Sequence, residues 1–196
     1  MIAIITGDII KSRTATPKIW LPVLEEAIAC FSKKFDIFRG DSFQLEVSVE
    51  QVLIAAFYIK AAMIEIGLDA RMGIGIGVKD DDEGRLKTTF GSALIYSGES
   101  FEELKKETLH LRTADEKLNA LCNTILPLLT ELTTRWTSNI AETVKLALLN
   151  EESSQSELAK KLKKKHQSLV STALQKGAYT KIQHAIAFCT TELLKL

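Results

Sequence analysis

Apolar residues follow a strand-like pattern in three short stretches of the first half of the chain. Residues 1–8 are almost wholly apolar up to Gly7-Asp8, as expected of a buried first strand. In residues 70–78 apolar side chains alternate with three glycines, which predicts a strand whose bare face lets a helix or a ligand approach closely. Residues 35–47 alternate around the turn-forming Gly40-Asp41, which predicts a β-hairpin with inward positions at Phe35, Ile37, Phe43, Leu45 and Val47.

Helical spacing fills the intervals between these strands. Residues 17–34, which follow Thr16 and begin with a proline, and residues 49–66, which stop before Gly67, are predicted helices. The order strand–helix–strand–strand–helix–strand belongs to the α+β or α/β classes, as a split βαβ arrangement. If the first strand neighbours the hairpin, Asp8 and Asp41 converge on one edge of the sheet.

The middle of the chain is less regular. Residues 79–87, KDDDEGRLK, predict a solvated charged turn rather than a cation site, because the acids lack the spacing of a calcium loop. The pair Ser100-x-x-Glu103 predicts a capping box that opens a helix after Ser100. A long helix containing Pro127 is predicted over residues 113–136. We therefore divide the chain into residues 1–111, a connecting helix at 112–138 and a last part at 139–196.

The last part of the chain has helical patterning throughout. One helix is predicted over residues 140–149, and a second starts at the capping box Ser154-x-x-Glu157. A third ends at Gly177, and a fourth covers residues 181–194.

Composition narrows the class of protein. No apolar run reaches the roughly 18 residues of a membrane span, and the N-terminus lacks the basic region of a secretory signal. Cys30, Cys122 and Cys189 lie far apart and fit reduced thiols in a cytoplasmic protein. The formal net charge is zero, but residues 155–196 carry eight lysines against two glutamates, which leaves 17 basic and 23 acidic residues before them. This charge of about +6 predicts an anionic partner for the C-terminal part.

The string QSELAKKLKKKHQSLVSTAL, residues 155–174, resembles the bacterial helix-turn-helix pattern, with packing positions at Leu158, Ala159, Leu162, Val170 and Leu174. Its turn is one residue longer than usual, and lysines stand where a glycine and an apolar residue are expected. The resemblance implies that the second helix enters a DNA major groove with Gln167, Ser168, Ser171, Thr172 and Gln175 toward base edges. Phosphates would be contacted by Lys160, Lys161, Lys163, Lys164, Lys165, His166, Lys176 and Lys181. The alternative is a helical dimerisation or packing module whose lysines are merely solvated.

The motifs ITGDIIKSR, FDIFRGDSFQ and RMGIGIG, a GSA segment, the W-T-x-x-x-A-E string of residues 136–142 and the helix-turn-helix together resemble the SatD family of bacterial proteins. The likeness covers nearly the whole chain. That family has no settled biochemical function, so the resemblance implies an arrangement of parts rather than an activity.

The N-terminal part is also similar to class III nucleotide cyclases and the GGDEF palm, which carry Asp-Ile at the end of the first strand and Gly-Asp in the hairpin. The resemblance implies a ferredoxin-like, cyclase-like palm (β-α-β-β-α-β) followed by an all-α helix-turn-helix module, within the α+β class. It also implies that Asp8 and Asp41 bind Mg²⁺. Nucleotide phosphates would be bound by Ile9, Ile10, Lys11, Arg13 and Gly40. Without that family context, Asp8 is a helix cap or turn residue and Asp41 a hairpin turn former.

Two departures from those families limit the predicted activity. Ile95 and Glu99 stand where cyclases carry the Asn and Arg that stabilise the transition state, and Ser42 stands where GGDEF enzymes carry an acid. Cyclisation by the known mechanism is therefore not expected.

Other chemistries find little support in the sequence. The three histidines lie far apart, no nucleophile motif is present, and G-x-G-x-G within a strand is no dinucleotide loop. The preferred hypothesis is a cytoplasmic, homodimeric DNA-binding transcriptional regulator whose N-terminal domain senses a nucleotide with Mg²⁺. The alternatives are a nucleotide-processing enzyme of the palm type and a degenerate structural or interaction protein.

Overall fold

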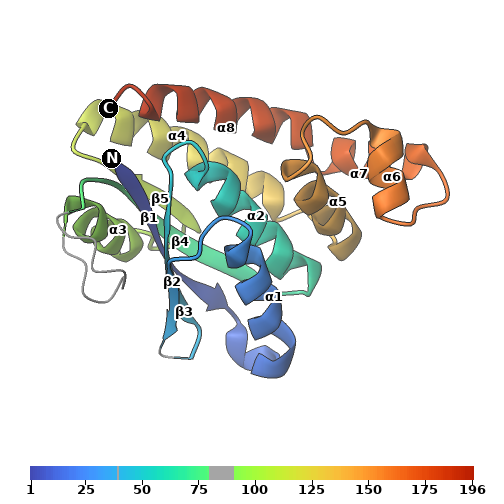
Figure 1. Ribbon diagram of the computed structural model, residues 1–196, viewed down its shortest axis with the longest axis horizontal. Helices are drawn as coiled ribbons and strands as arrows, with labels where there is room; N and C mark the ends of the chain where they lie inside the picture. The colour runs from blue at the N-terminus through green and yellow to red at the C-terminus, as the bar shows by residue number, and fades with distance from the viewer. Residues whose placement is uncertain (39, 80–90) are drawn as a thin grey trace.

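The chain folds as an α+β protein, shown in Figure 1 as a computed structural model that describes residues 1–38, 40–79 and 91–196. The N-terminal elements are β1 (Ile2–Ile10), the 3-10 turn η1 (Ser12–Thr14), α1 (Pro17–Ala29), β2 (Phe35–Phe38), β3 (Ser42–Val47), α2 (Val52–Glu65), β4 (Asp69–Gly77), α3 (Ser92–Glu102) and β5 (Leu109–Arg112). The C-terminal elements are α4 (Glu116–Thr133), α5 (Ser138–Leu148), α6 (Gln155–Lys161), α7 (Gln167–Lys176) and α8 (Tyr179–Leu193).

The described strands form one mixed sheet in the order β2-β3-β1-β4-β5. The first four are antiparallel to their neighbours, and β5 runs parallel to β4. The hairpin and the buried first strand follow the sequence prediction. In this register Asp8 lies opposite Ser42 on one side and opposite Arg71 on the other.

Helices cover both faces of the sheet, with α3 on one face and α1 and α2 on the other (Figure 1). The glycine face of β4 is the reason that α3 can lie so close. A Cβ added at Gly75 would stand 2.2 Å from both the Ala93 carbonyl oxygen and the Ser97 nitrogen. The predicted close approach of a helix to this strand is therefore confirmed.

The predicted start of a helix after Ser100 is wrong. Helix α3 begins at Ser92, and Ser100 is buried inside it, where its hydroxyl is hydrogen-bonded to His110 Nδ1 at 2.9 Å. Gly98 lies within the same helix, at a position where an added Cβ would meet nothing within 4 Å. The short strand β5 was not predicted. Residues 80–87 of the predicted charged turn, and Arg39 in the hairpin turn, lie outside the described residues.

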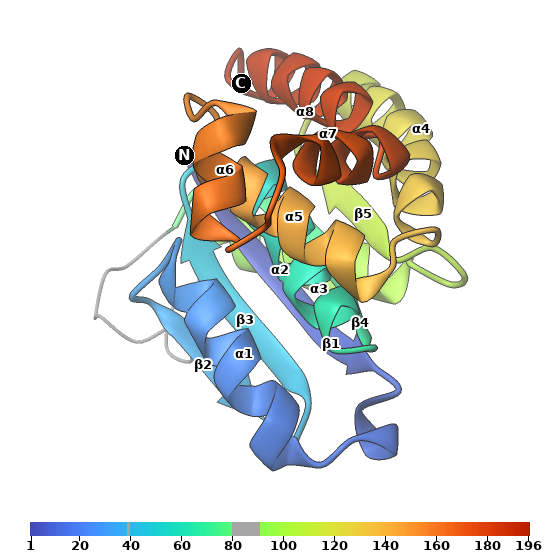
Figure 2. The same cartoon turned by 90° about the vertical axis from the view of Figure 1, so that its right-hand side faces the viewer.

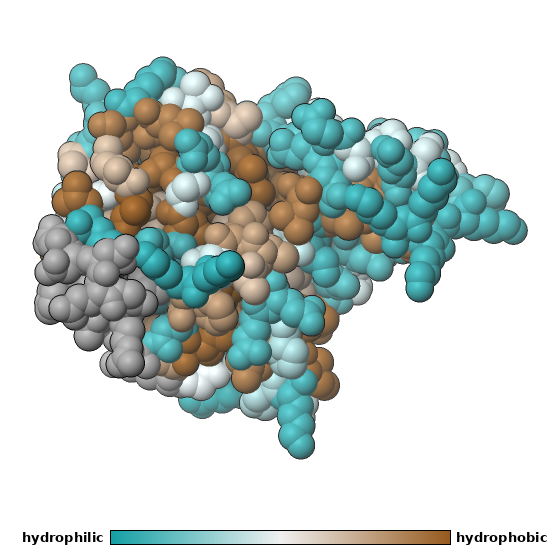
Figure 3. Space-filling model, viewed as in Figure 1, coloured by the Kyte–Doolittle hydropathy of each residue, from teal (hydrophilic) through white to brown (hydrophobic). Residues whose placement is uncertain are grey.

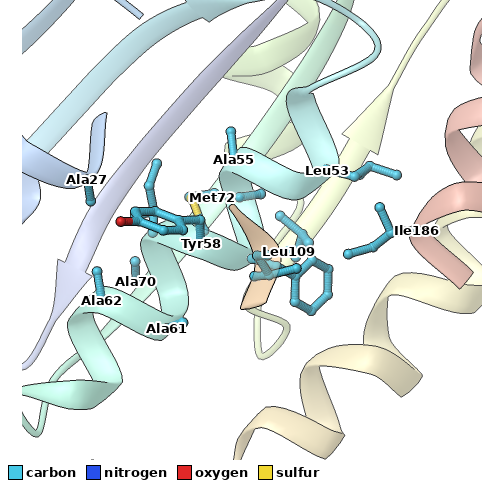
Figure 4. Close-up of a cluster of buried hydrophobic side chains, with 14 of the residues drawn as sticks. Ala27, Leu53, Ala55, Tyr58, Ala61, Ala62, Ala70, Met72, Leu109 and Ile186 are labelled. Atoms are coloured by element: carbon cyan, nitrogen blue, oxygen red, sulfur yellow. The ribbon is translucent and has the colours of Figure 1, made fainter. Parts of the chain in front are cut away.

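Helix α2 is the centre of the core. Eleven of its 14 residues are buried, because it is covered by the sheet, by α1 and by the C-terminal helices α5 and α8. Figure 4 shows its side chains Leu53, Ala55, Tyr58, Ala61 and Ala62 among labelled neighbours from α1, β4, β5 and α8. Lys60 is also fully buried there, and its ammonium donates to Asp69 Oδ1 at 2.7 Å, to the Ala70 carbonyl and to Thr108 Oγ1.

The C-terminal helices pack onto this core. Helix α4 runs continuously through Pro127, and α5 packs along α2. Ser138 donates to the Glu65 carbonyl oxygen, and Lys145 forms an ion pair with the Glu65 side chain. Trp136 is buried, and its Nε1 donates to the Gly177 carbonyl at 3.0 Å. The acidic and basic parts of the chain are therefore in direct contact.

The predicted helix boundaries shift by a few residues. Helix α1 stops at Ala29, five residues before the predicted end, and α2 starts at Val52. The capping box at Ser154 and Glu157 is confirmed, since each side chain bonds the other residue's backbone amide. Among the described residues, no helix combines the length and apolarity needed to cross a membrane.

Candidate functional site

The structure brings Asp8 and Asp41 together, as the sequence predicted. Asp8 is two residues from the end of β1, and Asp41 ends the turn between β2 and β3. The Ile9 amide donates to the Asp41 carbonyl oxygen at 3.2 Å, which ties the hairpin turn to β1. Because that amide already has a partner, the Ile9 N–H is occupied, and a ligand would have to compete for it.

Asp8 forms a bidentate ion pair with Arg71. The guanidinium donates from Nε to Oδ1 at 2.7 Å and from Nη2 to Oδ2 at 2.6 Å. The same guanidinium lies 5.2 Å from the centroid of the Phe101 ring on α3, which favours a cation at this position. The hydrogen bonds to Asp8 raise the pKa of Arg71 further above its ordinary value, so the arginine stays charged.

Both carboxylates have protein partners in this arrangement. The guanidinium occupies the position that a cation would take beside Asp8, and Asp41 Oδ2 accepts a hydrogen bond from Ser12 at 2.5 Å. Among residues 1–38, 40–79 and 91–196, no group of three or more His, Cys, Asp or Glu side chains is close enough to hold a metal ion. Magnesium binding by Asp8 and Asp41 stays a prediction, and it requires Arg71 to move.

The two aspartates lie in a hollow of about 550 Å³ at this end of the sheet, which we call the sheet-end hollow. Five cations line it against three acids. The predicted residues in its wall are Asp8, Ile9, Ile10, Lys11, Arg13 and Asp41, and the others are Ser12, Arg71, Lys105, Lys106, Glu107 and Thr108. Gly40, also predicted, lies instead in a neighbouring hollow that shares Ser12, Arg13 and Asp41 and includes Trp20.

Two of the four described non-glycine residues with positive φ lie in the wall of the sheet-end hollow. Lys11 and Lys105 have φ values of 62° and 46°, in the left-handed region that side chains other than glycine rarely adopt. Such residues occur often at ligand sites, because the surrounding structure holds them there at a cost of roughly 1–3 kcal/mol each. Lys11, Arg13, Lys105 and Lys106 have no acidic partner among the described residues, so four cations are available to an anion.

Sequence reasoning missed Ser12, Arg71, Lys105, Lys106, Glu107 and Thr108. The only available signal for Arg71 was its spacing of two residues from Gly73, which assigns it to the glycine face of the strand. Nothing local indicated that β4 would lie directly beside Asp8. The loop of Lys105 and Lys106 is positioned by β5, a four-residue strand that showed no usable periodicity.

The predicted DNA-contacting residues lie together on α7 and on the turn before it. Val170, Ala173 and Leu174 face inward and are buried. The outer face of α7 carries Gln167, Ser168, Thr172, Gln175 and Lys176, all exposed, together with the half-buried Ser171. Figure 2 shows α6 and α7 at the end of the molecule nearest the viewer, and Figure 3 shows this end as predominantly hydrophilic.

The basic residues before α7 differ in their exposure and in their contacts within the protein. Lys160, Lys163, Lys165 and His166 are exposed, and none of them forms an ion pair with another described residue. Lys164 is half-buried, and its ammonium lies 2.9 Å from Glu142 and 2.7 Å from Asn139 Oδ1 on α5.

Two further side chains in this region make polar contacts within the protein. Lys161 donates to Asn150, and Gln167 to Gln155. Lys161 is nevertheless exposed to solvent. Lys164, in contrast, points toward α5, where its contacts lie.

No protein-family model, no curated protein and no solved structure matches this chain.

Proposed function

We propose that this protein is a DNA-binding transcriptional regulator that contacts double-stranded DNA through α7 and the basic turn before it. The observation that carries the proposal is the outer face of α7. Its centre presents hydroxyl and amide groups, which are the groups that read base edges, and lysines stand at both ends, where backbone phosphates would lie. The net charge of about +6 over residues 155–196 supports the same conclusion.

The proposal includes the helix-turn-helix arrangement of α6 and α7. In its support, Ala159 and Leu158 of α6 are buried against the inward residues of α7, and the two helices are joined by only five residues. Regulators of this kind read symmetric sites as dimers, so a second copy of the chain is part of the proposal. The proposal also includes membership of the SatD family, on the basis of the motifs quoted in the sequence analysis.

For the N-terminal part we propose a ferredoxin-like, cyclase-like palm that senses an anionic ligand, of which a nucleotide is the best candidate. The strand order β2-β3-β1-β4, antiparallel throughout, supports the palm. The four unpaired cations around the sheet-end hollow support the proposal that the ligand is an anion. Magnesium would enter with the nucleotide only where the ligand draws Arg71 away from Asp8. A nucleotide-processing enzyme is the second candidate, favoured by the same hollow.

Replacing the outer face of α7 is expected to abolish sequence selection. The variant carries Gln167→Ala, Ser168→Ala, Thr172→Ala and Gln175→Ala, all at exposed positions, so the fold should be kept. Since each good base contact contributes about 1–3 kcal/mol of discrimination, selectivity should fall by roughly 100-fold or more, with binding to unrelated DNA retained. The measurement is enrichment of duplexes from a random library by the full-length protein.

The matched control replaces two exposed residues of α8, His184→Ala and Thr191→Ala, and should enrich the same sequence as the wild type. A wild-type protein that enriches no sequence would contradict the proposal. So would an α7 variant that selects the same sequence equally well.

Asp8→Asn is expected to strengthen anion binding in the sheet-end hollow. The change removes one negative charge and frees the guanidinium of Arg71, so affinity for inorganic pyrophosphate should rise roughly 3- to 10-fold, about 1 kcal/mol for one partly exposed charge. Isothermal titration calorimetry with and without Mg²⁺ measures this. Glu102→Gln, an exposed change on α3 outside the hollow, is the control. A loss of Mg²⁺-dependent binding in Asp8→Asn would show instead that Asp8 is a metal ligand.

A further inference from the structure

A second basic hollow, of about 560 Å³, lies between the start of α5 and the outer part of α7. We call it the α7 hollow. Three cations line it, each from a different segment. Arg135 comes from the turn between α4 and α5, Lys164 from the turn between α6 and α7, and Lys176 from the last residue of α7. Thr172 adds a hydroxyl, and no acidic residue is among those that line the hollow.

Arg135 and Lys176 are the cations left available for a ligand. Both are exposed, and neither has an acidic partner in the described part of the chain. Lys164 is partly neutralised by Glu142. Arg135 is also the only arginine after residue 112, in a region where every other basic side chain apart from histidine is a lysine. A guanidinium presents a planar fork of donors that matches two oxygens of a phosphate, which an ammonium does not.

The positions of Arg135 and Lys176 are fixed by their immediate neighbours. Trp136 is buried and donates through Nε1 to the Gly177 carbonyl at 3.0 Å. Gly177 packs so closely on α5 that an added Cβ would lie 2.9 Å from side-chain carbons of Ile140 and Val144. Since Arg135 precedes Trp136 and Lys176 precedes Gly177, this contact fixes the backbone positions from which both cations line the hollow.

We propose that the α7 hollow binds a backbone phosphate of the duplex that α7 contacts, with Arg135 as its anchor. This inference rests on the proposed DNA-binding function and adds a contact from outside residues 155–196. DNA is favoured over a free anion because Thr172 and Lys176 line the hollow and also belong to the outer face of α7. A phosphate bound there would lie on the strand beside that helix and would fix its orientation in the groove.

The test compares full-length Arg135→Gln and Lys176→Gln with the wild type in fluorescence anisotropy titrations. The probes are the duplex selected by the wild type and an unrelated duplex, each at several salt concentrations. Both variants should bind both duplexes roughly tenfold more weakly, and the slope of log K against log salt should become shallower by about 1, the value expected for one lost phosphate contact.

The control is Lys117→Gln, an exposed lysine in the first turn of α4, at the opposite end of that helix from Arg135. It should keep the wild-type affinity and slope. Because Arg135 has no partner within the described protein, the thermal midpoint of Arg135→Gln should also be unchanged, which separates a lost contact from a damaged fold.

The outcomes separate the inference from the function on which it rests. Selective wild-type binding together with an unchanged slope in Arg135→Gln overturns the anchor and leaves the DNA-binding function standing. Absence of wild-type binding to any duplex overturns both. Binding of inorganic phosphate that depends on Arg135, with DNA affinity unchanged, would assign the hollow to a free anion and overturn the inference.

Discussion

Gly75→Val is expected to prevent stable folding of the whole chain. A valine Cβ at this position would stand 2.2 Å from two backbone atoms of α3, and neither backbone atom can move without the helix. Overpacking of a core typically costs about 1–3 kcal/mol, and a clash with backbone on a central strand should exceed that range. Since a domain is stable by only about 5–15 kcal/mol, we expect little folded protein.

The measurement for Gly75→Val is urea unfolding followed by circular dichroism, or the soluble yield where no transition remains. The matched control is Gly98→Ala, on the outer side of α3, where an added Cβ meets nothing within 4 Å. Replacing a helical glycine by alanine should stabilise the protein by about 0.4–1 kcal/mol. A valine variant with the wild-type midpoint would show that α3 does not lie against β4 as described.

Asp69→Asn is expected to destabilise the protein strongly, by roughly 3 kcal/mol, because it leaves the buried ammonium of Lys60 without its counter-charge. Lys60 is fully buried, and Asp69 is its only acidic partner at 2.7 Å among the described residues. Lys60→Met removes the buried charge itself and leaves Asp69, which is 31% exposed, to be solvated. The methionine variant should therefore lie within about 1 kcal/mol of the wild type. Chemical denaturation of the three proteins measures both effects.

The pH dependence of Asp69→Asn gives an independent check. Burial lowers the pKa of Lys60, and the charge of Asp69 opposes that shift. Without Asp69 the folded pKa should fall further, while the unfolded chain keeps its proton up to about pH 10.4. Between those two values the unfolded state binds more protons, so stability rises with pH. The deficit of Asp69→Asn should therefore be smaller at pH 9 than at pH 7. An equal deficit at both pH values would contradict the role assigned to Lys60.

The sequence predicted those parts of the fold in which the spacing of apolar residues agrees with the turn-forming or capping residues beside them. The hairpin around Gly40 and Asp41, the glycine strand and the capping box at Ser154 each have a local cause, and all three are present. The start of α3 was not predictable in the same way. Its helix is stabilised by packing against the glycine face of β4, and the apparent capping signal at Ser100 is overridden because that side chain is buried.

The candidate site was predictable only as far as single strands define it. Asp8 and Asp41 could be brought together because Asp8 ends the first apolar run and Asp41 lies in the hairpin turn, and both features are recognisable in the sequence. Arg71 is 63 residues from Asp8, and its pairing depends on the register of β1 with β4, which no local pattern fixes. Arg135 is a similar case, since its place in the same hollow as Lys176 follows from the contact between Trp136 and Gly177, 41 residues apart.

The most direct test of DNA binding is an anisotropy titration of the full-length protein with the duplex upstream of its own gene. An unrelated duplex is titrated in parallel, at 50 and 200 mM salt. The proposal predicts selective binding to the upstream duplex and a steep fall in affinity with salt, about 10³-fold or more if six phosphates are neutralised. Failure to bind either duplex at the lower salt concentration, or an affinity that salt leaves unchanged, would contradict it.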